Sequence, residues 1–555
     1  MPEYTLGLDF GTNSVRALIV RVADGTEVGV SVAGYASGDA GILLDPARPD
    51  LARQHPGDYL DGMERAIRGA IEDAGRGFDA GSVVGVGVDT TGSTPIPVDA
   101  SGHPLAFDPA FAGNLDAAVW LWKDHTAHRE AARISETAAR IRPQYLAKCG
   151  GTYSSEWYWA KIWHCLNVAP EVFEAAHTWV EHADWIPAVL TGTEAPTELK
   201  RGICAAGHKA LFHHDWGGYP DAEFLAALDP RMARLREALP NRAYPVSEMA
   251  GRLTAEWADR LGLRAGVPVA VGAFDAHLGG VGSGVGEGTL VKIIGTSTCD
   301  ITTAPLSRDL PDIPGLCGIV PESVLPGAYG LEAGQSAVGD IFNWWVDVVR
   351  PSGHDHESLS AEASGLRPGE SGLLALDWHN GNRTVLVDQR LSGLILGLNL
   401  RSTPAEIYRT LIEATAFGAR VIVERFEEFG VPVDRVVNCG GISVKNALVL
   451  QIYADVLRRP MYVARSAQTC ALGAAVAGAV VAGAHPSFDA AVDAMTGVLE
   501  KHFAPDAGRA AVYDRLFAMY RRVHDAHGVR ASTDDLSDLM KTLLDLRDEI
   551  RSNQS

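Results

Sequence analysis

Two acidic residues follow short apolar segments and could place a carboxylate at the end of a β-strand. Asp9 lies near the end of residues 4–10 and precedes the small polar tip Gly-Thr-Asn-Ser at 11–14. Asp275 comes directly after the apolar segment 267–274 in a glycine-rich stretch. The first carboxylate could hold Mg²⁺ through water, and glycine lets backbone N–H groups approach a phosphate closely. These features indicate a site for a phosphate-bearing ligand.

Two further small-residue turns suit the same ligand. Gly-Thr-Ser-Thr at 295–298 follows an apolar strand and suits α- and β-phosphates. Asn-Cys-Gly-Gly-Ile-Ser at 438–443, with Asn446 just beyond, places a double glycine where an adenine or ribose could lie flat against main chain. No Gly-Lys dipeptide occurs, so a Walker A loop is excluded. Asp-Phe-Gly at 9–11 mimics a protein-kinase motif, but the chain before it is too short for the upstream motifs of that class.

The segments that carry these residues alternate between strands and helices. Residues 4–10 and 15–22 predict a hairpin, whose first strand we expect to be half-buried. Further strands are predicted at 83–88 and 290–294. Each half thus places a strand before a Gly-Thr turn: residues 4–10 precede Gly11-Thr12, and residues 290–294 precede Gly295-Thr296. The pattern favours an α/β fold with two related domains that face each other. Apolar residues recur at helical spacing at 59–71, 404–429 and 446–457.

The composition excludes several kinds of partner. With 555 residues and 46% hydrophobic content, the chain should fold into more than one globular unit. A formal net charge of −21 argues against nucleic acid or an anionic membrane, which need a basic face. The start shows no secretion signal, and the longest small-apolar run, 471–483, is too short to span a bilayer. Seven scattered cysteines indicate free thiols, so we expect a cytoplasmic protein.

Taken in their order and spacing, these motifs resemble the FGGY family of carbohydrate kinases, which share the fold of actin and the heat-shock-chaperone ATPases. The resemblance extends over roughly residues 4–500. Thr410 departs from the small Ala or Ser usual at its position, which we interpret as a tolerated packing change. Further landmarks of the family stand at 161–163, 170–173, 184–186, 190–192, 393–398, 406–413, 451–455 and 471–475.

The resemblance implies an α/β, two-domain actin-like ATPase fold, with ribonuclease H-like sheets and a cleft between the lobes. We expect an N-terminal domain at 1–286 with the sugar site and catalytic base, a C-terminal nucleotide domain at 287–505, and a helical extension at 506–555. ATP would be the phosphate donor, and Asp9 would hold Mg²⁺ through water. The residues implied to bind ATP are Gly11, Thr12, Asn13, Arg16, Gly295, Thr296, Ser297, Gly440, Gly441 and Asn446.

The resemblance also assigns the catalytic role to Asp275, as the general base that takes the proton of the sugar's terminal hydroxyl. Within the family, the sugar side is most similar to the members that phosphorylate L-ribulose in L-arabinose catabolism. That likeness lies in the stretches 87–95, 120–125, 151–157, 206–210 and 330–336. The residues implied to bind the sugar are Gly92, Ser93, Trp122, Lys209, Asp275 and Glu332.

Two alternatives stay open at this point. A kinase for D-ribulose, D-xylulose or ribitol would carry the same family motifs. A non-catalytic sugar sensor, an actin-like filament protein or a chaperone ATPase would share the fold. The presence of Asp275 argues against the sensor, and the tryptophan-rich stretch 120–216 argues against the chaperone.

The tail from Ser532 predicts an amphipathic helix, with Ser532 and Asp535 as a capping box. Its apolar stripe would pack either on its own domain or against a second subunit, which would make a homodimer. The stripe consists of Leu536, Leu539, Leu543, Leu546 and Ile550.

Overall fold

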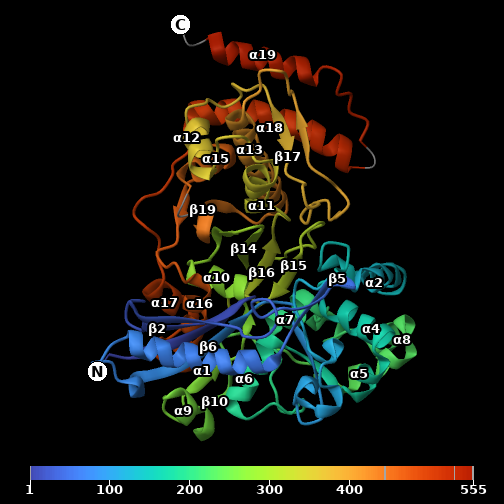
Figure 1. Ribbon diagram of the computed structural model, residues 1–555, viewed down its shortest axis with the longest axis vertical. Coiled ribbons are helices and arrows are strands. Elements are labelled where there is room, and N and C mark those ends of the chain that lie inside the picture. The colour runs from blue at the N-terminus through green and yellow to red at the C-terminus, as the bar shows by residue number, and fades with distance from the viewer. Residues whose placement is uncertain (1, 443–445, 530–531, 553–555) are drawn as a thin grey trace.

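Two mixed β-sheets organise the chain, one in each half of the molecule (Figure 1). The computed structural model describes residues 2–442, 446–529 and 532–552. The first sheet has the order β10-β11-β6-β1-β2-β3, and β12 pairs with β6 off this path. Its strands are β1 (Tyr4–Phe10), β2 (Ser14–Arg21), β3 (Glu27–Gly34), β6 (Val83–Thr90), β10 (Met249–Arg252), β11 (Pro268–Ala270) and β12 (Ala273–Phe274).

The second sheet repeats this arrangement, with the order β15-β16-β14-β13-β19-β20. In each sheet an antiparallel hairpin, β1–β2 or β13–β14, pairs with a parallel strand, β6 or β19. The prediction of two related α/β domains is therefore confirmed. The strands of the second sheet are β13 (Gly288–Ile294), β14 (Thr298–Pro305), β15 (Gly318–Pro321), β16 (Ala328–Ala333), β19 (Val433–Cys439) and β20 (Met461–Val463).

Helices and three small sheets surround the two main sheets. The first half contains α1 (Pro56–Asp73), α2 (His128–Ile141), α3 (Pro143–Ala147), α4 (Tyr158–Val168), α5 (Pro170–Ala175), α6 (His182–Thr191), α7 (Ile203–Lys209), α8 (Ala222–Leu228), α9 (Ala255–Leu261) and α10 (Asp275–Gly282). The second contributes α11 (Gly339–Asn343), α12 (His356–Ser364), α13 (Pro404–Glu428), α15 (Ala447–Leu457), α16 (Thr469–Val481), α17 (Phe488–Met495), α18 (Ala507–Gly528) and α19 (Leu539–Ser552). The short strands are β4 (Leu43–Asp45), β5 (Arg48–Gln54) and β8 (Val119–Trp120); β7 (Pro95–Val98) and β9 (Thr178–Glu181); and β17 (Leu374–Leu376) and β18 (Leu394–Leu396).

Helix α13 shows why the longest helical prediction was accurate. Thr403 accepts a hydrogen bond from the Glu406 backbone, and the Glu406 side chain accepts one from the Thr403 backbone. This capping box and Pro404 in the first turn fix the start of the helix. Gly430, with a φ of 78°, follows its end, where a left-handed residue stops helical propagation.

Helix α16 comes from the second half of the sequence but packs on the sheet of the first half, beside β2 and β6 in Figure 1. A Cβ on Gly7 would lie 1.8 Å from the Ala471 carbonyl oxygen, and one on Gly87 equally close to that of Ala474. Only glycines permit this approach. Strand β1 is consequently buried along almost its whole length, so the prediction of a half-buried strand is wrong.

The segment 267–274, predicted as one strand, is broken into β11 and β12. The break lies at Gly272, where a Cβ would lie 2.0 Å from the Ala183 carbonyl oxygen of α6. Strand β12 then pairs with β6 and runs directly into α10. The break therefore places Asp275 beside the carboxyl end of β6.

The C-terminal helix begins later than predicted. Helix α19 starts at Leu539, and Asp535 accepts from the backbone of Ser537 at 2.9 Å, so the capping box is wrong. Arg522 of α18 binds Asp534 at 3.0 Å and Asp538 at 2.9 Å, which holds this acidic segment outside a helix. The apolar stripe packs into the core of the second half, the first of the two placements expected from the sequence. Its buried members are Leu539, Leu543, Leu546 and Ile550.

All seven cysteines lie among the described residues and are free, as predicted. Five of them are buried: Cys149, Cys165, Cys204, Cys317 and Cys439. Across the described ranges, the search for a helix with the length and apolarity of a membrane span found none.

Candidate active site

Three carboxylates meet at the carboxyl ends of neighbouring strands in the first sheet. Asp9 of β1 lies in parallel register with Asp89 of β6, and Ala273 of β12 lies in register with Asp89 on the other side. Asp275 follows two residues after Ala273, as the first residue of α10. Because the carboxyl ends of parallel strands share one edge of a sheet, the fold brings Asp9, Asp89 and Asp275 together.

Asp9 and Asp89 differ in how their charge is balanced. Arg16, opposite Asp9 across the β1–β2 hairpin, pairs with it at 2.8 Å. Burial nevertheless raises the pKa of Asp9 above its ordinary value. Asp89 is fully buried and, apart from the neighbouring Asp9 carboxyl, its oxygens have no hydrogen-bond partner among the described residues. Burial, with the charges of Asp9 and Asp275 adding to it, raises the pKa of Asp89 well above normal.

Asp275 is half-buried, and its Oδ1 accepts a 2.6 Å hydrogen bond from the backbone N–H of Ala276. Burial is the main cause that raises the pKa of Asp275 to about 7, and the negative charge of Asp9 adds to it. The positive charge of Lys209 acts in the opposite direction. A carboxyl group with such a pKa can accept and release a proton near neutral pH.

An ion pair beside Asp275 joins the two halves of the molecule. The ammonium of Lys209, the last residue of α7, lies 3.0 Å from both carboxylate oxygens of Glu332 in β16. The Lys209 ammonium also lies 5.2 Å from the centroid of the Trp157 ring. Lys209 and Glu332, both predicted to bind the sugar, are thus brought together, and each offers directional polar atoms.

Trp122 and Thr12 connect the predicted sugar and phosphate sites. The indole Nε1 of Trp122 donates to Thr12 Oγ1 at 3.0 Å, and Gln54 donates to the Thr12 carbonyl at 2.8 Å. Asn13, at the exposed tip of the hairpin, donates to the Ala40 carbonyl at 2.8 Å. Gly11 donates its N–H to the Ser14 carbonyl and closes the same turn.

Ser93 and Gly92 occupy a crowded turn. The Ser93 hydroxyl donates to the buried Glu181 carboxylate, which also accepts from Thr94 N–H at 2.8 Å. Lys161 donates to the Ser93 carbonyl at 2.8 Å. A Cβ on Gly92 would lie 1.9 Å from the Phe274 ring, so glycine is required there. The Ser93 side chain is therefore already engaged within the protein.

The predicted nucleotide turns converge in the second half. Gly295 and Thr296, at the tip between β13 and β14, are exposed, and Ser297 is half-exposed. Gly440, with a φ of 91°, lies against Ile294, where an added Cβ would be 2.5 Å from the carbonyl oxygen. The tip of the hairpin and the end of β19 are thus adjacent; Gly441, next to Gly440, is exposed.

Asn446, which the resemblance implies to bind ATP, forms the N-cap of α15. Its side chain accepts from Val449 N–H at 3.3 Å as the N-cap of α15 and donates to Ser360 at 3.0 Å. Both polar ends of the Asn446 amide are therefore engaged within the protein. Ser443, the last residue of the glycine motif, lies outside the described residues.

Comparison with known proteins decides which family this geometry represents. The model of the N-terminal domain of the FGGY family of carbohydrate kinases matches residues 4–282, and that of the C-terminal domain matches 290–482. The chain belongs to the FGGY family of carbohydrate kinases. It is therefore an enzyme, a phosphotransferase that uses ATP to phosphorylate a sugar, with the two-domain actin-like fold of this family.

Named relatives of this FGGY kinase extend over nearly its whole length. A ribulokinase of Shouchella clausii is 42% identical, covering 99% of this chain and 98% of its own. A ribulokinase of Mycolicibacterium smegmatis is 41% identical, covering 95% of this chain and 94% of its own. The solved structure of xylulose kinase from Rhodospirillum rubrum has a TM-score of 0.76 at 24% identity, covering 94% of this chain and 99% of its own, and shows the shared fold.

Several residues of the candidate site were not predicted from the sequence. Asp89 carries the same signal as Asp9, an acid at the end of an apolar strand, and could have been found by it. Glu181 has no local signal, because Ser93, which it binds, lies 88 residues away. The buried histidines His208 and His277, beside Glu332, lie within or next to stretches singled out from the sequence, but nothing in the sequence shows that these two separate helices bring them together.

Proposed function

We propose that this FGGY kinase transfers the γ-phosphoryl group of ATP to the terminal hydroxyl of L-ribulose, giving L-ribulose 5-phosphate, as the kinase step of L-arabinose breakdown. The observation that carries the proposal is Asp275, a carboxyl group with a pKa of about 7 that lies beside the Lys209–Glu332 pair. The near full-length similarity to proteins named ribulokinase supports the choice of sugar.

Asp275 would act as the general base. Its carboxylate takes the proton of the sugar's terminal hydroxyl, the hydroxyl oxygen bonds to the γ-phosphorus, and the bond from phosphorus to the β–γ bridging oxygen breaks to release ADP. General-base help of this kind is typically worth about 10²–10⁴ in rate. A pKa of about 7 suits this role, because the group is substantially ionised at neutral pH yet remains an effective base.

Lys209 and Glu332 would orient the sugar. Sugar hydroxyls need both donors and acceptors, and a buried hydroxyl left unpaired costs about 1–3 kcal/mol. The ammonium supplies donors and the carboxylate supplies acceptors from opposite halves of the chain. Trp122 would present its ring as an apolar face, and the Gly92–Ser93 turn would contribute main-chain groups, since the Ser93 hydroxyl is engaged.

The nucleotide would be held by turns from both halves. Backbone groups of Gly11, Thr12 and Asn13, together with Arg16, would face the γ-phosphate. The exposed tip formed by Gly295, Thr296 and Ser297 would hold the remaining phosphates. Gly440 and Gly441 would provide the floor for adenosine, and Asn446 would shape it by fixing the start of α15.

Asp9 and Asp89 fit a magnesium ion. Mg²⁺ prefers carboxylate oxygens and usually retains several waters. The Asp89 oxygens contact no donor among the described residues, which leaves buried acceptors beside Asp9. When bound, Mg²⁺ would supply charge neutralisation for the phosphates. Asp9 would hold it through water, and Asp89 would support the same position.

We further propose the domain limits 1–286 and 287–505, with 506–555 as a helical extension, and a cytoplasmic location. The break between the two family matches, at residues 282 and 290, supports the first limit. The free thiols support the location. Helix α18 contributes Tyr513 and Phe517 to the core of the second half, so the extension would be integral to that domain.

A substrate panel tests the function. Purified protein with Mg²⁺ and ATP would be assayed for ADP release with L-ribulose, D-ribulose, D-xylulose, ribitol and glycerol, with Asp275→Asn prepared identically as the control. We expect the highest kcat/KM for L-ribulose and a phosphomonoester at C5 by ³¹P NMR. Preference for D-xylulose or ribitol would reassign the enzyme within the family. Absence of sugar-dependent ADP release with every five-carbon ketose and alditol would reject the proposal.

A further inference from the structure

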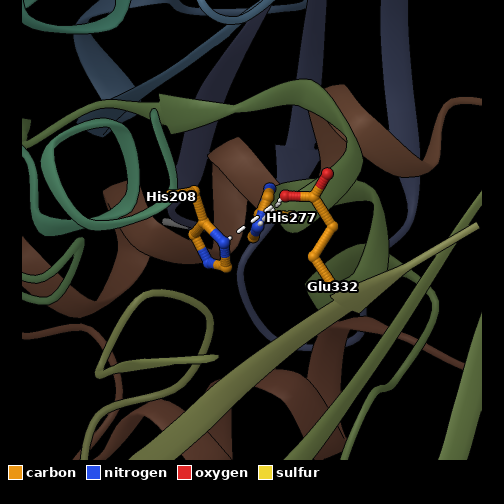
Figure 2. Close-up of side chains that lie close together, drawn as sticks. All are labelled: His208, His277 and Glu332. Atoms are coloured by element: carbon orange, nitrogen blue, oxygen red, sulfur yellow. Dashed lines mark ion pairs between the residues drawn. The ribbon is translucent and has the colours of Figure 1, made fainter. Parts of the chain in front are cut away.

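His208, His277 and Glu332 converge where the two halves of the molecule meet (Figure 2). His208 lies in α7, His277 in α10 and Glu332 in β16. One ligand atom from each, two ring nitrogens and a carboxylate oxygen, all lie within 4.8 Å of one another. All three side chains are buried. Neither histidine has a part in the phosphoryl transfer proposed above.

The contacts around His208 suit the tautomer that carries its proton on Nε2. The Ser323 hydroxyl can donate to the Val320 carbonyl at 3.0 Å, and its oxygen can then accept from His208 Nε2 at 2.9 Å. In that tautomer, Nδ1 of His208 carries the lone pair, 3.4 Å from the carboxylate oxygen Oε2 of Glu332. Two acceptors then face each other, an arrangement that a bound cation would stabilise.

His277 adds a third acceptor to the same point. Its Nε2 lies 3.7 Å from Glu332 Oε2, and neither of its ring nitrogens has a hydrogen-bond partner among the described residues. An imidazole nitrogen that has no hydrogen-bond partner can offer the lone pair with which histidine binds metals.

The separations of these atoms from Glu332 are close to those in a tetrahedral metal centre. Two ligand atoms at about 2.1 Å from zinc, at the tetrahedral angle, are about 3.4 Å apart. The separations of Glu332 Oε2 from His208 Nδ1 and His277 Nε2 are 3.4 and 3.7 Å, and all three ligand atoms lie within 4.8 Å of one another, so a small rotation of the imidazoles would complete this spacing. We propose that a divalent cation of the zinc class binds here, held by His208 Nδ1, His277 Nε2 and Glu332 Oε2. Two nitrogens and one oxygen favour such a cation over Mg²⁺, which prefers oxygen alone.

Binding of this cation would inhibit the kinase. Lys209 donates to both oxygens of Glu332 at 3.0 Å, so a cation on Oε2 would repel the ammonium and remove a proposed sugar ligand. Zinc should therefore compete with the sugar and leave ATP affinity unchanged. This consequence rests on the proposed function, whereas the metal site itself does not.

Cobalt titration of the tag-free full-length chain, without sugar or nucleotide, tests the site directly. Co²⁺ in a tetrahedral N/O site gives intense visible d–d absorption, and we expect saturation at one ion per chain. His208→Gln and His277→Gln should each weaken binding by at least about tenfold. The control is His354→Gln, whose Nε2 lies 3.4 Å from Glu362 in a more exposed histidine–carboxylate pair, and it should not change binding. Absence of the band in the unaltered chain, or its retention in both glutamine variants, would overturn the site.

Lys209→Met is a second variant, and its expected effect on Co²⁺ affinity is opposite to that of the two glutamine variants. Removal of the competing ammonium should tighten Co²⁺ binding by at least about tenfold, a result that a merely misfolded variant cannot give. Unchanged or weaker binding would contradict the geometry proposed.

In the kinase assay, Zn²⁺ should raise the apparent KM for L-ribulose in the unaltered chain but not in His277→Gln. Stoichiometric binding without inhibition would reject only the proposed competition between metal and sugar, and the metal site would stand. Failure of the substrate panel would likewise leave the metal-binding result intact.

Discussion

The indole N–H of Trp122 donates a 3.0 Å hydrogen bond to the hydroxyl of Thr12, across 110 residues of chain. Trp122 follows the short strand β8, and Thr12 stands at the tip of the β1–β2 hairpin. The bond connects a residue proposed for the sugar to one proposed for the γ-phosphate. A change at either end should therefore affect the use of both substrates.

Trp122→Phe tests this coupling, because it retains an aromatic ring but removes the donor. A hydrogen bond of this kind contributes about 1 kcal/mol, so kcat/KM should fall by roughly fivefold for both ATP and sugar. Steady-state kinetics with each substrate varied in turn measures the effect. Thr12→Val should give a similar loss, and the double variant should be no worse than either single one, since both remove the same bond. Fully additive losses would show that the bond does not couple the sites.

Asp275→Asn should separate binding from turnover. The amide keeps the shape of the side chain but cannot accept the hydroxyl proton, so kcat should fall by about 10²–10⁴ while the KM for sugar changes within a few fold. Coupled ADP-release assays measure both constants. Turnover close to that of the unaltered enzyme would remove Asp275 from the role of base.

The pH profile gives an independent view of the same group. With a pKa of about 7, Asp275 is progressively protonated as the pH falls, so kcat/KM should decline below neutral pH. The positive charge of Lys209 lowers the pKa of Asp275, so Lys209→Met should move this acidic limb to higher pH. A limb that stays in place would mean that another group controls it.

Asp89→Asn should stabilise the protein in the absence of metal. The folded-state pKa of Asp89 is raised, so above its unfolded pKa of about 3.9 folding opposes the ionisation that the unfolded chain prefers. The gain in melting temperature should therefore be largest at high pH and shrink as the pH falls towards that value. A few degrees are expected, because 1 kcal/mol shifts Tm by about 2–4 °C in domains of 150–250 residues.

Calorimetry in EDTA from pH 5 to 8 measures this trend. If Asp89 also supports Mg²⁺, the stabilised variant should bind the ion more weakly in direct titration. A stabilisation that does not depend on pH would show that relief of buried charge is not its cause.

The sequence predicted the elements with local signals and missed the contacts made over long distances. The β1–β2 hairpin, α13 and the strand before Gly295 were predicted from apolar periodicity, caps and turns, each within a short window. The pairing of Ser93 with Glu181 and of Lys209 with Glu332 has no such signal, because residues 88 and 123 positions apart meet only after folding. For the second pair, family resemblance identified both residues, but only the structure shows that they bind each other.

Lys209→Met and Glu332→Gln should destabilise the junction between the halves. Removing one partner of a buried ion pair leaves the other charge uncompensated, which typically costs about 3–5 kcal/mol. The double variant leaves no such charge and should be less destabilised than the sum of the two single variants. Urea denaturation at pH 7.5 measures the three differences. Additive losses would mean that each side chain is stabilised by other groups, and the pair would not be the unit that joins the halves.

Helix α19 offers a matched pair of adjacent leucines. Leu543 is 1% exposed, within the core of the second half, whereas Leu544 is 40% exposed. Leu543→Ala should leave a cavity and cost about 2–5 kcal/mol of unfolding free energy, while Leu544→Ala should stay within about 0.5 kcal/mol of the unaltered protein. Denaturation curves, with size-exclusion chromatography of each variant, measure both effects. Equal losses at the two positions, or dissociation of an oligomer by Leu544→Ala, would show that the outer face of the helix is also covered, as in the homodimer that the sequence left open.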